Sequence, residues 1–251
     1  AIYILQLLLQ LVVTATVVGA GWALGSALLQ SRLLRFREEP ILAATVAPPA
    51  HAAVGPRVYL VMLIHGDEPE GRVHAREIVR RLAPAVRLNR ATLRVVESMN
   101  PDGEAAGTRG NARGVDLNRN WPAANFRPAR SHGPEPLSEP EAAAVHADLL
   151  AFKPDLLVVL HSTARGPFVN YDGPAENLAA AFSAAAGRFD PRWHVVPSMG
   201  YPTPGSLGSY MGVDAGVPSL TVEFERGQNA RAAAQQAVTG LRAVLNHPRQ
   251  P

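Results

Sequence analysis

Short apolar runs that alternate with amphipathic segments dominate the pattern of the chain from residue 41 onward. The runs are rich in Val, Leu and Ile and are bounded by turn residues, which is typical of strands buried inside a sheet. They predict strands at 41–46, 57–64, 92–96, 155–160 and 218–224. The intervening segments predict helices at 69–82, 140–152, 175–187 and 229–246. Because strands alternate with helices, we expect a three-layer α/β/α sandwich with a mixed, mostly parallel central sheet.

Two local signals refine this pattern. Ser138 followed by Glu141 predicts a capping box, with Pro140 at the first helical position. Residues 104–137 have little periodicity and are dense in Gly, Asn, Arg and Pro. Unstructured stretches of this length inside a compact domain are usually functional or disordered. Since the sequence contains no linker and no internal repeat, residues 32–251 are expected to form one domain.

The first 31 residues contain no charged side chain and consist mostly of Leu, Val, Ala and Gly. An uncharged apolar stretch of this length predicts a membrane-anchoring helix that precedes the domain. The first positive charges follow it directly at Arg32, Arg35 and Arg37, which favours the cytoplasmic face of the membrane. Two alternatives stay open: a retained signal peptide, or an apolar first helix that packs on the domain.

The composition restricts the possible metal ligands and gives no indication of a nucleic-acid partner. The net charge is only +3, and the sequence has no Lys/Arg run and no nucleic-acid-binding motif. Nucleic acid is therefore not an expected partner. The chain contains no cysteine, so thiolate metal ligands are excluded. Any metal site must use imidazole and carboxylate groups.

Three predicted strands end in residues with such groups. The run 57–64 leads into His65 and Glu68, the run 155–160 ends at His161, and the run 218–224 contains Glu223. Open α/β sheets place their ligand sites just outside strand ends. Two histidines and one carboxylate are the ligands of many catalytic zinc ions, and a further glutamate can activate a water molecule. The sequence therefore predicts a zinc hydrolase.

Five motifs occur in a fixed order between residues 65 and 223. They are His65-x-x-Glu68, Asn-Pro-Asp-Gly at 100–103, Gly-Val-Asp-Leu-Asn-Arg-Asn-Trp at 114–121, the strand-terminal His161, and Thr221-x-Glu223. In these motifs the chain resembles the zinc carboxypeptidase family. The resemblance covers most of the predicted domain, and it implies a carboxypeptidase-like fold and a peptidase activity.

The resemblance also implies catalytic roles. One zinc ion would be bound by His65, Glu68 and His161. Glu223 would act as general base toward water and then as proton donor to the leaving amine. Arg109 would stabilise the oxyanion of the tetrahedral intermediate, and Arg113, four residues further on, is the competing candidate.

Substrate-binding roles follow in the same way. Asn118 and Arg119 would hold a substrate carboxylate, for which the planar guanidinium group is well suited. Tyr201 corresponds to the mobile tyrosine that caps the substrate in this family. Tyr210 is the alternative for that role.

One position departs from the digestive members of the family. They usually carry an arginine just before the metal-binding glutamate, where this chain has Asp67. This residue and the short domain resemble the bacterial murein peptide amidase branch, whose members cut the γ-D-glutamyl–diaminopimelate bond of cell-wall peptides. We hypothesise that Asp67 pairs with a substrate ammonium group.

The motifs also bear on two other functions. The succinylglutamate desuccinylase and aspartoacylase branch shares the metal-site pattern and hydrolyses N-acyl amino acids, but the motifs at 100–103 and 114–121 and the segment around Tyr201 favour a peptidase. A membrane-anchored metal-binding module without catalysis would typically lack the general base or the oxyanion arginine. Both Glu223 and Arg109 are present.

Overall fold

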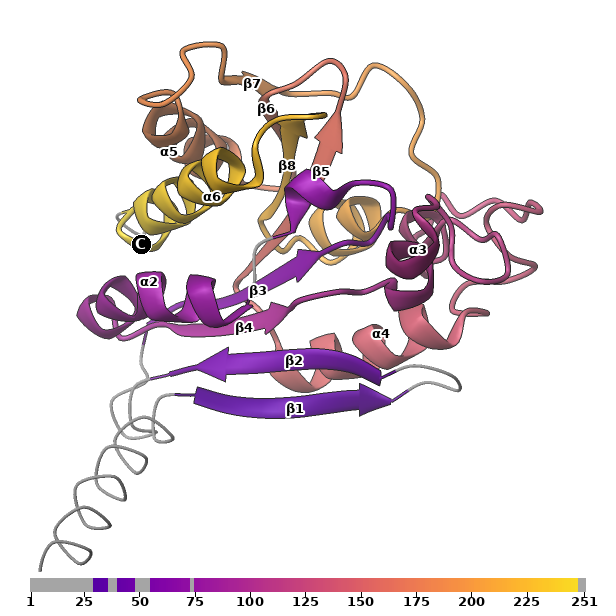
Figure 1. The fold of residues 1–251 in the computed structure, drawn as a ribbon. Helices are drawn as coiled ribbons and strands as arrows, with labels where there is room; N and C mark the ends of the chain where they lie inside the picture. The colour runs from indigo at the N-terminus through magenta and orange to yellow at the C-terminus, as the bar shows by residue number, and fades with distance from the viewer. Residues whose placement is uncertain (1–28, 36–39, 48–54, 73–74, 248–251) are drawn as a thin grey trace, which may run out of the picture.

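A mixed eight-stranded sheet forms the centre of the protein. The computed structural model describes residues 29–35, 40–47, 55–72 and 75–247 (Figure 1). Across the sheet the strands follow the order β1-β2-β4-β3-β5-β8-β6-β7. Their bounds are β1 (Leu29–Arg35), β2 (Pro40–Val46), β3 (Arg57–Met62), β4 (Thr92–Val96), β5 (Leu156–Thr163), β6 (Phe168–Asp172), β7 (His194–Val196) and β8 (Ser219–Glu225).

The direction of the strands positions the functional edge of the sheet. The four central strands β4, β3, β5 and β8 run parallel to one another. On their flanks, β2 is antiparallel to β4, β1 to β2 and β6 to β8, whereas β7 is parallel to β6. The carboxyl ends of β3, β5 and β8 therefore meet at one edge, where open α/β sheets place their ligands.

Helices cover both faces of this sheet, as predicted (Figure 1). On one face, α2 (Ala75–Leu88), α5 (Glu176–Ala186) and α6 (Ala230–Leu245) pack against the larger hydrophobic cluster. On the other face, α4 (Pro140–Phe152) packs against a second cluster. The short helix α3 (Pro101–Ala106) lies beyond β4. The predicted three-layer sandwich is confirmed.

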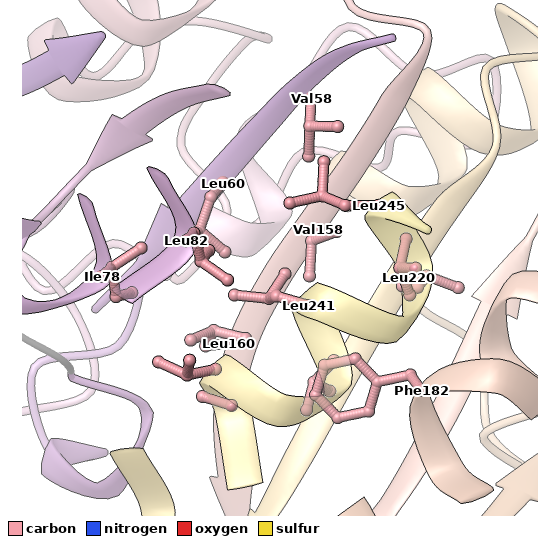
Figure 2. Close-up of a cluster of buried hydrophobic side chains, with 14 of the residues drawn as sticks. Val58, Leu60, Ile78, Leu82, Val158, Leu160, Phe182, Leu220, Leu241 and Leu245 are labelled. Carbon is pink, nitrogen blue, oxygen red and sulfur yellow. The ribbon is translucent and has the colours of Figure 1, made fainter. Parts of the chain in front are cut away.

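Each apolar run packs into the hydrophobic clusters on both faces of the sheet, because successive side chains of a strand point to opposite faces. In β3, Val58, Leu60 and Met62 belong to the cluster under α2, α5 and α6, whereas Tyr59 and Val61 belong to the cluster under α4. Figure 2 shows the first cluster, with Leu241 and Leu245 of α6 lying against side chains of β3, β5 and β8. A continuous apolar run is thus what a strand buried on both faces requires.

Truncating this cluster is expected to destabilise the fold. Leu241 is 1% exposed in α6, so we expect Leu241→Ala to lower the free energy of unfolding by about 2–5 kcal/mol through lost burial and a residual cavity. The control is Leu88→Ala in α2, where the leucine is 78% exposed. That change should stay within about 0.5 kcal/mol. Urea unfolding followed by circular dichroism measures both, and equal effects would contradict the assignment of the core.

The helix predicted at 69–82 is wrong in its bounds. Residues Pro69–Gly71 form a separate 3₁₀ turn, η2, and α2 runs from Ala75 to Leu88. The turn is held against the sheet by Glu70, whose carboxylate accepts hydrogen bonds from the Ser162 hydroxyl at 2.6 Å and from the Gly227 backbone N at 2.7 Å. The helix continues past Pro84 because the residues that follow the proline are buried in the core.

The predicted capping box is also wrong. α4 begins at Pro140, but its N-cap residue is Glu139, whose side chain makes no capping hydrogen bond. The Ser138 hydroxyl instead donates to the Glu139 carboxylate at 3.0 Å. That carboxylate accepts from Asn111 and Arg113 at 2.7 and 2.8 Å. The buried acid thus ties the loop before α4 to the 104–137 segment.

Several elements were not predicted. They are β1, β6, β7, the short helix α3, the short turn η3 (Leu117–Arg119) and the π-helical turn η4 (Ser209–Asp214). Because β1 begins at Leu29, the last three residues of the predicted apolar segment 1–31 belong to the sheet. The predicted anchor otherwise lies outside the described residues. Among the residues that are described, no helix combines the length and the apolar character needed to cross a membrane.

Candidate active site

His65, Glu68 and His161 converge at the carboxyl edge of the sheet. One ligand atom from each lies within 4.8 Å of the others, and all three residues are buried. The Nδ1 atoms of His65 and His161 lie 2.9 and 2.8 Å from the two carboxylate oxygens of Glu68. The structure therefore brings together the three predicted zinc ligands.

A tight turn after β3 places two of these ligands side by side. The chain leaves the strand through Leu63, which has a positive φ of 49°, and the backbone N of Glu68 then donates to the carbonyl of His65 at 3.3 Å. Gly66 fits between them because it packs directly on the start of α3. A Cβ at position 66 would lie 1.9 Å from the carbonyl carbon of Gly103, so any larger residue would push the turn away from its support.

Asp116 orients the first histidine. Its Oδ1 lies 2.9 Å from His65 Nε2 and also accepts from the backbone N of Asn118 at 2.8 Å. When the Nε2–H of His65 donates to Asp116, the Nδ1 atom of His65 carries a lone pair that points at Glu68. His65 Nδ1 and the Glu68 carboxylate are then two hydrogen-bond acceptors that face each other. A positive charge between them is needed to hold them together. A zinc ion supplies such a charge, so the donor set and its orientation fit zinc.

The same contacts shift the pKa values of His65 and Glu68. Burial by itself would lower the pKa of His65, but its hydrogen bonds to Asp116 and Glu68 outweigh burial and raise that pKa. Burial would raise the pKa of Glu68, but His161 and His65 outweigh it and hold that pKa far below its usual range. Glu68 is therefore held as a carboxylate, the form that binds a metal ion.

Glu223 lies beside this cluster on the next strand. In the parallel pairing of β5 with β8 it is the register partner of His161, and only 7% of its surface is exposed. Burial raises the pKa of Glu223, the charge of His161 opposes this, and the charge of Glu68 adds to it. A carboxylate whose proton affinity is increased in this way is suited to accept a proton from water.

The structure separates the two candidate arginines. Arg109 faces the cluster, with Nη1 3.3 Å from Glu68 Oε1 and Nε 2.9 Å from Asp116 Oδ2. Arg113 points away and binds Glu139 and the carbonyl of Ser138. Only Arg109 of this pair is placed where an oxyanion could form.

We expect Arg109→Ala to lower kcat/KM by about 100- to 1,000-fold, because it removes a preorganised donor for developing negative charge. Arg113→Ala is the matched control, since it removes an arginine from the same loop without touching the cluster. Zinc content measured for both variants separates catalysis from metal loss. If the two variants have the same kcat/KM, Arg109 is not the oxyanion donor.

Asn118 and Arg119 follow Asp116 in the short turn η3 (Leu117–Arg119). The Asn118 amide Nδ2 lies 3.4 Å from His161 Nε2, and its Oδ1 accepts from the backbone N of Leu207 at 3.0 Å. Burial lowers the pKa of Arg119, with nearby Arg109 acting in the same direction. A bound carboxylate would offset this cost of holding a partly desolvated cation.

Of the two candidate tyrosines, Tyr201 is the one that lines the cavity. It is 47% exposed, and the guanidinium of Arg165 lies 5.5 Å from its ring centre. The Tyr210 hydroxyl instead lies 2.9 Å from Nε2 of His146, and its ring stacks on Trp121 at 6.2 Å. Tyr210 therefore packs against the hydrophobic cluster between the sheet and α4.

Asp67 does not line the cavity. Its Oδ2 lies 3.5 Å from Nη1 of Arg226, and Nη2 of the same guanidinium lies 3.5 Å from Glu68 Oε1. Arg226 thus brings a positive charge to Glu68 from a distant part of the sequence. The hypothesis that Asp67 binds a substrate ammonium stays a prediction, and its cationic neighbour in this structure is Arg226.

A cavity of about 180 Å³ opens in front of the cluster. It is lined by every predicted site residue except Asp67. Further lining residues were not predicted from the sequence: Asn170, Asp172, Thr203, Ser206 and Arg226. Arg226 is three positions after Glu223, which is the one signal that could have drawn attention to it. Asn170 and Asp172 lie on the unpredicted strand β6, so no motif pointed to them.

Comparison with known proteins agrees with this geometry. The sequence profile of the zinc carboxypeptidase family matches residues 36–235. The chain belongs to the zinc carboxypeptidase family. As a zinc carboxypeptidase family member it is a metal-dependent hydrolase, and the buried His65, Glu68 and His161 are a group that can hold the ion.

Three relatives within or near this family are informative. The chain is 30% identical over 217 residues to murein peptide amidase A of Escherichia coli strain K12, covering 80% of this chain and 84% of that protein. The crystal structure of the murein-tripeptide amidase of Escherichia coli O157 matches with a TM-score of 0.60 and 27% identity over 88% of this chain and 93% of that one. A metallo-carboxypeptidase from Burkholderia cenocepacia matches with a TM-score of 0.66 and 25% identity, covering 92% and 67%.

Proposed function

We propose that this zinc carboxypeptidase family member hydrolyses the γ-D-glutamyl–diaminopimelate bond of cell-wall peptides, an amide next to a free carboxylate. The observation that carries the proposal is one cavity that joins the convergent His65, Glu68 and His161 to Glu223 and to the guanidinium of Arg119. The similarity to murein peptide amidase A over 84% of the length of that protein supports the choice of substrate.

The residues of the cavity account for each part of such a reaction. Arg119 and Asn118 bind the free carboxylate and so place the amide in front of Glu223. Glu223 takes a proton from water as the water oxygen bonds to the amide carbon, and it returns that proton to the nitrogen as the carbon–nitrogen bond breaks. Arg109 stabilises the negative charge that develops on the carbonyl oxygen. A bound zinc ion supplies Lewis-acid polarisation and an increased acidity of water.

The test is a mass-spectrometric cleavage assay on the zinc-loaded chain. The substrates are the murein tripeptide L-Ala-γ-D-Glu-diaminopimelate, ordinary C-terminal peptides, and N-succinyl or N-acetyl amino acids, each with and without chelator. Chelator-sensitive release of diaminopimelate is the expected result. Cleavage of only ordinary peptides, or of only the N-acyl amino acids, would contradict the proposed substrate, and the second outcome would assign the deacylase function instead.

We also propose that the apolar segment at the start of the chain attaches the enzyme to a membrane, with the domain on the cytoplasmic side. The support is the absence of charge in residues 1–31 and the positions of Arg32, Arg35 and Arg37. Membrane fractions from cells that produce the full chain should retain the protein after an alkaline carbonate wash. Its release by that wash would contradict anchoring, and protease protection in spheroplasts tests the side.

A further inference from the structure

Glu70 is a buried acid beside the candidate metal site that the proposed reaction does not use. It lies in η2, two positions after Glu68, and 7% of its surface is exposed. Both of its carboxylate oxygens accept a short hydrogen bond: Oε2 from the Ser162 hydroxyl at 2.6 Å, and Oε1 from the Gly227 backbone N at 2.7 Å. These partners lie 92 and 157 positions further along the chain. One side chain therefore connects three distant segments of the sequence.

Each of the three connected segments also carries a group of the candidate site. The pairs are Glu70 with Glu68 in the segment after β3, Ser162 with His161 in β5, and Gly227 with Glu223 at the end of β8. The carboxyl ends of β5 and β8 lie side by side in parallel pairing. Glu70 thus ties the turn that presents Glu68 to both of these strand ends at once.

Glu68 in turn receives contacts from both strand ends. Its Oε2 accepts from the backbone N of Ser162 at 3.1 Å, and its Oε1 lies 3.5 Å from Nη2 of Arg226. Ser162 is the residue whose hydroxyl donates to Glu70, and Arg226 directly precedes Gly227. The Arg226 guanidinium also donates to the Ser162 carbonyl at 3.4 Å. Glu70 therefore holds in place two of the residues that contact the Glu68 carboxylate.

Close packing leaves Glu70 little freedom to move. The next residue, Gly71, lies against β5, where a Cβ would come within 2.9 Å of the Leu160 carbonyl oxygen. The backbone N of Gly71 also donates to the carbonyl of Glu68 at 3.2 Å. A carboxylate buried in such a turn needs hydrogen-bond partners, because an unpaired buried charge is strongly destabilising. The two short hydrogen bonds of Glu70 supply them.

We propose that Glu70 is a positioning residue for the metal site. It holds Ser162 and Arg226 where they contact Glu68, and so presents the Glu68 carboxylate to the ion in a fixed orientation. Glu70 itself does not line the cavity, so it acts through these neighbours and not on the substrate. The inference rests on the zinc site of the proposed function, but not on the choice of peptide.

The experiment measures the zinc dissociation constant of Glu70→Ala by competition with a fluorescent zinc chelator. This change removes both hydrogen bonds, and we expect the Kd to rise about 10- to 100-fold, the usual effect of losing a group that orients a metal ligand. Circular dichroism and the Tm of the metal-free protein are measured on the same preparation. They separate lost zinc affinity from lost folding.

A conservative variant tests position against charge. In Glu70→Gln the amide oxygen can accept from the Gly227 backbone N, and the amide NH₂ can donate to the Ser162 hydroxyl oxygen. Both connections are kept while the charge is removed, so zinc affinity should stay close to that of the wild type. If Glu70→Gln loses as much affinity as Glu70→Ala, the charge of Glu70 and not its connections is responsible, and the inference is wrong.

Ser162→Ala tests the path from Glu70 to Glu68. It removes one of the two hydrogen bonds and keeps the backbone N that donates to Glu68, so it should weaken zinc binding less than Glu70→Ala does. Combined with Glu70→Ala, it should add less than its separate effect, because both changes break the same hydrogen bond. Fully additive effects would show that the two residues act independently and would count against the inference.

A surface glutamate provides the matched control. Glu77 lies in α2, where its carboxylate pairs with Arg81 Nη1 at 3.0 Å. Glu77→Ala should leave the zinc Kd unchanged. An equal rise in Kd for Glu77→Ala and Glu70→Ala would show that the effect is not specific to the connected segments.

The failure of this inference is distinct from that of the proposed function. A folded Glu70→Ala that binds zinc as tightly as the wild type would overturn it. If Glu70→Ala does not fold, Ser162→Ala decides, since an unchanged Kd in that variant would also overturn it. If the murein tripeptide is not cleaved, the proposed substrate fails and the zinc measurements still hold. A wild type that binds no zinc would overturn both proposals.

Discussion

Glu223→Gln is expected to bind zinc like the wild type and to hydrolyse substrate about 100- to 10,000-fold more slowly, the usual size of a general acid–base contribution. The amide has nearly the shape of the carboxylate but cannot take a proton from water. Because Glu223 lies beside His161 without being one of the three convergent ligands, zinc content should not change. Single-turnover kinetics and metal analysis on the same preparation measure the two quantities.

The same strand offers a matched control. Glu225 is two residues further along β8 and pairs with Arg192 at the surface. Glu225→Gln removes one carboxylate from the same strand without changing the cavity lining. Its turnover should match that of the wild type. Turnover above a tenth of the wild-type rate in Glu223→Gln would show that another group is the general base.

Removing the metal, or one of its ligands, is expected to abolish turnover altogether. His161→Ala deletes one of the two imidazoles of a buried three-residue set, so both zinc binding and activity should fall below detection. Chelation of the wild type should give the same loss of activity, and added zinc should restore activity only to the wild type. Activity of the wild type that survives complete removal of metal would contradict a metal-dependent mechanism.

Thermal unfolding gives an independent measure of the same site. Zinc at about 1,000 times its dissociation constant stabilises the folded state by about 4 kcal/mol. For a chain of this size, that corresponds to a rise in Tm of roughly 8–16 °C. His161→Ala should lose the rise. His194→Ala should keep it, because His194 is exposed in β7 and contacts a backbone carbonyl of its own segment.

Local patterns in the sequence predicted the parts of the fold that depend on local properties. The apolar runs at 57–64, 92–96, 155–160 and 218–224 correspond to β3, β4, β5 and β8. Such runs are recognisable because a strand buried on both faces is apolar throughout. The short β6 has polar Asn170 and Asp172 on one face, and this face lines a cavity, so its pattern did not indicate a strand.

The candidate metal-binding group was predictable for a related reason. Each of its members lies at or just past the carboxyl end of a recognisable strand, and parallel strands deliver their carboxyl ends to one edge of a sheet. The ordered motifs between His65 and Glu223 added the rest, since they occur together in one family. Spacing alone did not decide between Arg109 and Arg113, because residues four apart in an aperiodic loop can face any direction. The turn before Asp116 decided it, by directing Arg109 at Glu68.

The sequence by itself determined the central strands, the three-layer class and the identity of three converging groups that can hold a metal ion, because these follow from strand periodicity and from what lies at strand ends. Only the tertiary structure decided which charges are neutralised. It paired Asp67 with Arg226 across 159 positions of the chain, and it directed Arg109 at Glu68 and Arg113 at Glu139. Electrostatic pairing depends on distance in space and on burial, and neither quantity is encoded in the local order of residues.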